Sequence, residues 1–153
     1  MRLCTGRKAA TLLAVLALTC AAGDAASYAR QTAPPNPVLV LQGLESFQSG
    51  GKDFTRYRFG VDNFAAYPDA MFAASPQLPP CGQNKKASRT WVDVYAQDGK
   101  RLNGFCAFGK ASDLNSIWFA LESDAVPPSW VYVELTDRAA GAKYKSNLAD
   151  TAQ

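Results

Sequence analysis

Apolar and polar residues alternate in short segments from Pro37 to the end of the chain. This period-two alternation is typical of half-buried β-strands, and no stretch sustains a helical period over three turns. The pattern predicts seven or eight strands and hence an all-β protein. The candidate segments are Val38–Phe47, Phe54–Asn63, Ala70–Ala73, Thr90–Ala96, Leu102–Phe108, Ser116–Leu121, Trp130–Thr136 and Ala142–Asn147.

Turn residues lie between these segments. Asp98-Gly99 is the strongest hairpin signal, because this dipeptide tolerates the positive φ values of a type I′ turn. Pro79-Pro80 and Pro127-Pro128 predict loops, since proline cannot donate a hydrogen bond to a strand ladder. A single helical turn at Asp113-Leu114, capped by Ser112, is the only helix that the pattern supports.

Composition and strand spacing together indicate the fold class. The 153 residues are 48% hydrophobic and 11% aromatic, which suits one compact domain. Short strands at regular spacing predict an antiparallel sandwich with one core, and a closed barrel is the main alternative.

Two segments resemble parts of fibronectin type III domains. Residues 131–147, VYVELTDRAAGAKYKSN, are similar to the last hairpin of that family, and residues 56–63, RYRFGVDN, are similar to its second strand. The resemblance implies an immunoglobulin-like, fibronectin III-like antiparallel sandwich of seven to eight strands. The chain departs from the family because it lacks the second-strand tryptophan and carries a cysteine pair. Its last loop, residues 138–141, also lacks the adhesive tripeptide of some fibronectin modules, so integrin binding is not implied.

A second resemblance is to small exported bacterial proteins with no assigned activity. It rests on PPCG at 79–82, SRTWVDVY at 88–95 and GFC at 104–106. It implies an exported β-rich domain and no mechanism.

The N-terminus predicts export. Arg2, Arg7 and Lys8 precede an apolar run, Ala9–Ala22, which is too short for the roughly 20 residues of a membrane-spanning helix. We therefore expect a signal peptide at 1–26, a proline-containing flexible tether at 27–36, a domain at 37–153, and no transmembrane span in the mature chain. Lipidation at Cys20 is the alternative that we do not favour, because Ala17 and Thr19 depart from the usual lipoprotein box. Localisation would be secreted or periplasmic.

The cysteines agree with this compartment. Cys81 and Cys106 would remain after cleavage, and an even pair in an exported chain predicts one disulfide. A redox-active pair is the alternative, but the C-x-x-C spacing is absent.

Charge and the missing histidine narrow the possible chemistry. The formal net charge of +3 falls to +1 without residues 1–26, since three basic residues and one acidic residue leave with them. We therefore expect no nucleic-acid partner. The sequence has no histidine, which excludes serine–histidine and cysteine–histidine nucleophiles and most zinc sites. We predict no catalytic residue, no metal and no cofactor.

All three tryptophans lie in opposite phase to the aliphatic residues of their strands. The resulting binding-face hypothesis comprises five aromatic residues that are expected to point outward, mixed with acidic groups such as Asp93 and Glu134. Such a face could stack on sugars or seat a protein. The alternative is that these rings cover sheet edges, pack under loops or form the core themselves. The five residues are Trp91, Tyr95, Trp118, Trp130 and Tyr132.

Two functions follow as hypotheses. The first is an exported, non-catalytic β-sandwich that binds a protein or glycan partner at the cell envelope. The alternative is a small secreted hydrolase that depends on carboxylates, or an inhibitor-like effector. Its candidate carboxylates are Asp53, Asp62, Asp69, Asp93 and Asp98, most of which turn formation also explains.

Overall fold

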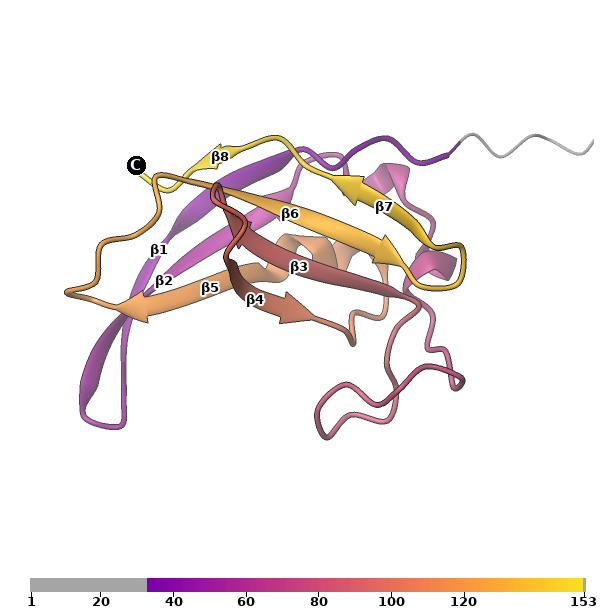
Figure 1. Cartoon of the computed structure of the whole chain (residues 1–153), viewed down its shortest axis with the longest axis horizontal. Helices are drawn as coiled ribbons and strands as arrows, with labels where there is room; N and C mark the ends of the chain where they lie inside the picture. Colours follow the sequence, from indigo (N-terminus) through magenta and orange to yellow (C-terminus); the bar gives the residue numbers. More distant parts are fainter. Residues whose placement is uncertain (1–32, 153) are drawn as a thin grey trace, which may run out of the picture. The chain divides into compact units, whose positions relative to one another are not determined.

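A computed structural model describes residues 33–152. The predicted signal peptide and most of the predicted tether lie outside the described residues. The described chain forms two antiparallel sheets with eight strands in total, an arrangement compatible with a β-sandwich (Figure 1). The all-β prediction is therefore confirmed. Within residues 33–152, no helix has the length and apolar character that crossing a membrane would require.

The first sheet has three strands in the order β1-β2-β5. They are β1 (Leu39–Ser49), β2 (Lys52–Val61) and β5 (Ile117–Glu122). Gly50 and Gly51 join β1 to β2, both with positive φ, as a type I′ hairpin turn requires. In Figure 1 the tip of this hairpin extends past the end of β5.

The second sheet has five strands. Its order is β4-β3-β6-β7, and a short strand, β8, also pairs with β6. The bounds are β3 (Thr90–Ala96), β4 (Arg101–Phe105), β6 (Trp130–Asp137), β7 (Ala142–Lys145) and β8 (Ala149–Asp150).

One core lies between the sheets. Alternate residues of each strand point inward, so β3 follows a strict pattern of buried and half-buried positions. Tyr57 and Phe59 of β2 stack on Phe119 of β5. The largest fully buried side chains are Leu39, Phe59, Val61, Phe72, Val92, Val94, Leu114, Ile117, Phe119, Val131, Val133 and Leu135.

Side-chain amides link the two sheets on both sides of the core. The Asn147 Oδ1 accepts a hydrogen bond from the Leu39 N–H at 2.8 Å, and its Nδ2 donates to the Leu39 carbonyl at 3.1 Å. One amide thus satisfies both backbone groups of Leu39 that point away from β2. On the other side, the Asn103 Nδ2 donates to the Trp118 carbonyl at 2.7 Å and joins β4 to β5.

Three local predictions need correction. Ala70–Ala73 is not a strand: Asp69–Phe72 forms the 3₁₀ helix η2, which buries Met71 and Phe72. The hairpin at Asp98-Gly99 exists, but the Ala96 N–H donates to the Lys100 carbonyl, so the loop has three residues, 97–99, rather than being a two-residue type I′ turn.

The third correction concerns the predicted helical turn. It is the 3₁₀ helix η3 (Ala111–Ser116), which is preceded by Lys110 and not capped by Ser112. The Asp113 carboxylate accepts hydrogen bonds from the Gly109 and Lys110 N–H groups at its start. A further 3₁₀ helix, η1 (Phe64–Ala66), follows β2.

The start of the described chain is hydrogen-bonded to the domain. Residues 33–36, the end of the predicted tether, have no regular structure. The Tyr67 hydroxyl nevertheless donates to the Pro35 carbonyl at 2.5 Å, and the Asn63 Nδ2 donates to the Asn36 carbonyl at 3.0 Å. Burial, together with nearby Tyr144, raises the pKa of Tyr67, so this hydroxyl stays a donor.

The predicted disulfide is confirmed. Cys81 lies in the long connection from η2 to β3, and Cys106 directly follows β4, with their Cα atoms 5.8 Å apart. The bond fixes the connection beside the edge of the second sheet, where the Ser88 N–H also donates to the Cys106 carbonyl at 2.7 Å.

We predict that replacing both cysteines with alanine lowers the free energy of unfolding by about 3.5 kcal/mol, because the disulfide closes a loop with a sequence separation of 25. Denaturant unfolding of the oxidised wild type and the double variant measures this loss. A loss below about 1 kcal/mol would mean that hydrogen bonds such as Ser88 to Cys106 hold the connection on their own.

An ion pair between the half-exposed Arg89 and the buried Asp137 fixes the turn after β6. Asp137 is 3% exposed and accepts hydrogen bonds from Arg89 Nε at 2.7 Å and Nη2 at 2.5 Å. It also accepts from the Ala139 and Ala140 N–H groups. The Arg89 hydrogen bond, helped by the two backbone donors, holds the pKa of Asp137 below its ordinary value although burial opposes this.

Asp137→Ala should therefore lower the free energy of unfolding by about 2–4 kcal/mol, since it leaves the Arg89 guanidinium and two amides without their acceptor.

Because the folded-state pKa of Asp137 is depressed, its stabilisation is present above the ordinary carboxyl pKa of about 3.9 and is lost as pH falls through the folded value. Unfolding measured from pH 7 down to pH 2 should show a smaller loss for Asp137→Asn than for the wild type. Equal losses would contradict this role of Asp137.

Candidate functional site

Four of the five predicted aromatic residues lie on the outer face of the five-stranded sheet. β3 presents Trp91 and Tyr95 there, and β6 presents Trp130 and Tyr132. Tyr95 is paired with Tyr132, and their rings stack with centroids 5.3 Å apart. Trp130 is 40% exposed at the start of β6. We call this surface the β3–β6 face.

Trp118 lies on the other sheet. It is on β5, 37% exposed, and packs edge-on against Phe105. The Arg56 guanidinium carbon lies 4.9 Å from its ring centroid and 4.7 Å from that of Phe47, so the arginine is held between two rings. The five aromatic residues therefore do not share one face, which corrects the expectation from the sequence. Alternation shows that Trp118 points away from the core, but it cannot show which sheet contains Trp118.

Two ion pairs cross the middle of the β3–β6 face. Asp93 and Glu134 are directly paired on β3 and β6, and opposed carboxylates repel unless they are neutralised. Arg101 donates to Asp93 and Lys143 donates to Glu134, each at 2.7 Å. The hydrogen bond with Glu134 raises the pKa of Lys143.

Two further cations lie over the aromatic rings. The Arg138 guanidinium carbon is 4.2 Å from the Trp91 ring centroid, and the Lys145 Nζ is 3.9 Å from that of Tyr132. Such contacts are stabilised by the negative face of the ring. Neither cation forms a salt bridge within residues 33–152. With Asp150, which is exposed and pairs with Trp130 across β6 and β8, the face carries four cations and three carboxylates.

The ends of β3 and β6 frame a shallow hollow of about 430 Å³ on this face. Partial burial raises the pKa of Tyr95, and the charges of Asp93 and Glu134 add to this effect. The hollow is lined by Trp91, Asp93, Tyr95, Glu134, Thr136, Arg138, Gly141 and Lys143.

No family model, curated protein or solved structure matches this chain. The chemistry of the site must therefore be judged from its own residues.

Three of the five candidate hydrolase carboxylates accept hydrogen bonds that hold the fold. The Asp98 carboxylate accepts from the Lys100 N–H, that of Asp69 from the Ala111 N–H, and that of Asp53 from the Gln48 amide. Asp93 on β3 lies directly opposite a second carboxylate, which belongs to Glu134 on β6. Within the described residues, no group of three or more histidine, cysteine or acidic side chains is arranged to hold a metal ion.

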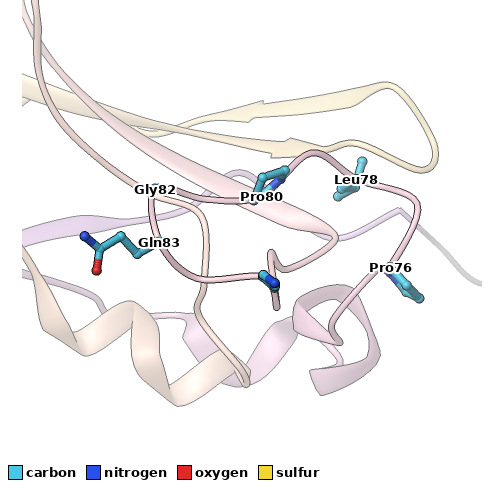
Figure 2. A pocket seen from close by; sticks show the side chains of 6 residues that line it. Pro76, Leu78, Pro80, Gly82 and Gln83 are labelled. Carbon is cyan, nitrogen blue, oxygen red and sulfur yellow. The ribbon is translucent and has the colours of Figure 1, made fainter.

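A larger hollow, of about 550 Å³, lies beside the disulfide in the connection to β3 (Figure 2). Figure 2 shows Pro76, Leu78 and Pro80 along one loop, with Gly82 and Gln83 at its turn. Lys85 completes the lining. This lining has no hydroxyl, thiol or carboxylate side chain, so its chemistry is that of a loop surface.

The cations of the β3–β6 face were not anticipated from the sequence. Lys143 and Lys145 alternate with Ala142 and Tyr144, and this period-two pattern places both lysines on one face of the last hairpin. The position of Arg138 over Trp91 has no comparable signal, because it depends on how the β6–β7 turn folds back.

Gly104 makes the Asp93–Arg101 ion pair possible. A Cβ at this position would collide with the Arg101 guanidinium and the Asp93 carboxylate. Gly104 lies directly opposite Asp93 in the β3–β4 pair, so the missing side chain leaves room for the arginine to fold across the strand.

We predict that Gly104→Ala displaces Arg101 from Asp93 but costs only about 1 kcal/mol or less, because the arginine is exposed and can move. The Nε–Hε resonance of Arg101 should shift in the NMR spectrum. Gly109→Ala is the matched control, since its nearest contact, Asp113 Oδ2, lies at an ordinary 3.8 Å. An unchanged Arg101 signal in Gly104→Ala would contradict the steric role of Gly104.

Proposed function

We propose that this chain is an exported, non-catalytic binding domain that recognises a partner at the cell envelope through the β3–β6 face. The observation that carries the proposal is the combination on one sheet face of four aromatic side chains and two ring-bound cations without carboxylate partners. Aromatic and arginine side chains dominate binding energy in protein interfaces. The disulfide supports an oxidising compartment.

The chemistry of the face favours a protein partner with acidic groups over a glycan. Sugar rings stack on open aromatic faces, but Arg138 covers Trp91 and Lys145 covers Tyr132. These two cations are already held in place, so binding a carboxylate would cost them little conformational entropy. Carboxylates of a partner would also offset the excess of cations over carboxylates on the face.

We further propose that the fold is fibronectin type III-like. Seven main strands divide into three and four, and β4 joins the sheet of β3 rather than that of β5. In the immunoglobulin constant type the fourth strand lies in the other sheet. Two features depart from antibody domains: the disulfide links a connection to the end of β4 rather than joining the sheets, and Trp91 points outward.

The test compares matched tryptophan variants. Trp91→Ala combined with Tyr132→Ala should weaken partner binding about tenfold or more. The double variant removes two rings and, with them, the ring contacts of two cations, Arg138 and Lys145. Trp118→Ala is the control, since Trp118 lies on the other sheet and, like Trp91, has an arginine over its ring. A photo-crosslinking residue at position 136, which lines the hollow on the β3–β6 face, would capture the partner from an envelope extract. One at position 118 serves as the control, and a glycan array would be probed in parallel.

Capture from position 136 that is lost in the double variant, and that weakens at high salt, would support an acidic protein partner. Selective glycan binding that the double variant abolishes would instead identify a glycan as the ligand. Equal loss of binding in Trp118→Ala and the double variant would contradict the β3–β6 face as the site.

The carboxylate-dependent hydrolase remains a second candidate because Asp93 and Glu134 are opposed on the floor of the hollow. Asp93→Asn and Glu134→Gln separate the two functions. A turnover on glycoside or ester substrates that both variants abolish, with the unfolding free energy unchanged, would overturn the non-catalytic proposal.

A further inference from the structure

Beyond its bulge at Gly43, the long edge strand β1 has little of the usual protection against pairing. It has 11 residues and lies at the end of the order β1-β2-β5. Glu45 is its only charged residue, and it contains no lysine or proline. Natural edge strands are typically short or carry charges and prolines that prevent edge-to-edge contact.

The β1–β2 ladder fixes which backbone groups of β1 are free. At one end, the Asp62 N–H donates to the Val38 carbonyl, and at the other, Ser49 pairs with Lys52 across the glycine turn. In an antiparallel ladder, residues that bond to the neighbouring strand alternate with residues whose N–H and C=O point away.

Beyond the bulge at Gly43, the outward-pointing residues are Leu44, Ser46 and Gln48. No hydrogen bond satisfies their backbone groups within residues 33–152, whereas Asn147 satisfies those of Leu39. Leu44 is also 43% exposed. The edge from Leu44 to Gln48 therefore offers backbone donors and acceptors beside an exposed aliphatic side chain.

We infer that this edge binds a second copy of the chain, with β1 pairing antiparallel to β1 of the other copy across a two-fold axis at Ser46. This inference is independent of the proposed function, because β1 and the β3–β6 face belong to different sheets.

The sequence of the edge suits such self-pairing. A two-fold axis at Ser46 pairs Ser46 with its own copy and Leu44 with Gln48 of the other copy, so all the outward backbone groups meet as bonded pairs. Glu45 then lies opposite Phe47, and its carboxylate already accepts a hydrogen bond from Arg56 at 3.1 Å. No like charges are opposed in this register.

The first test is the oligomeric state of the full chain. Sedimentation velocity over a range of concentrations should reveal a reversible dimer. Ser46→Pro should raise the dimer dissociation constant by about tenfold or more, because proline removes an outward N–H and leaves the β1–β2 ladder intact. Ser46→Thr is the matched control and should dimerise as the wild type does.

The second test fixes the register by crosslinking, in a background where Cys4 and Cys20 are serine. Ser46→Cys should form an intermolecular disulfide on mild oxidation, because the paired Cα atoms would lie about 5.5 Å apart. Gln48→Cys should not, since four residues of offset separate its two copies by about 13 Å.

The inference would be overturned by a monomer at every concentration, by a dimer that Ser46→Pro leaves unweakened, or by equal crosslinking of the two cysteine variants. Circular dichroism of Ser46→Pro ensures that a lost dimer reflects the edge and not an unfolded chain.

Discussion

The antiparallel pairing of β3 with β6 is the constraint on which the fold and the candidate site both depend. Seven residue pairs, from Thr90–Asp137 to Ala96–Val131, hold the two strands in one register. That register sends the valines into the core and places the rings, the carboxylates of Asp93 and Glu134, and Thr136 on the outer face. Because side chains alternate, a slip of one residue would exchange the two sets. The core and the β3–β6 face are therefore two consequences of one ladder.

Much of the fold could be predicted because the deciding information is local. The bounds Thr90–Ala96 match β3, and the cysteine pair identified the disulfide. Ala70–Ala73 could not be predicted correctly, since four residues with two large apolar side chains suit a buried strand and a buried 3₁₀ turn equally. The two-residue strand β8 lies below the length at which alternation is visible. The dipeptide Gly50-Gly51 is also a sequence signal for a two-residue hairpin turn, and both glycines have positive φ.

For the candidate site, the sequence predicts on which side of a strand each side chain lies, but not which residues meet there. Alternation alone was sufficient to expect Trp91, Tyr95 and Tyr132 to point away from the aliphatic residues of their strands. It could not assign Trp118 to a sheet, because sheet membership depends on pairing between distant segments. The ring-bound cations depend on tertiary geometry in the same way. The resemblance to fibronectin type III domains implied the type of architecture but none of these contacts.

The bond between Asn147 and Leu39 also bears on the order in which the molecule forms. The two residues are 108 positions apart, so the backbone of Leu39 has no amide partner while most of the chain is still being made. Contacts of such long sequence separation form slowly, because closing the intervening loop has an entropic cost that later contacts must offset. The β1 edge that begins at Leu39 therefore stays unpaired until late in folding. During this time, pairing with another chain competes with completion of the fold.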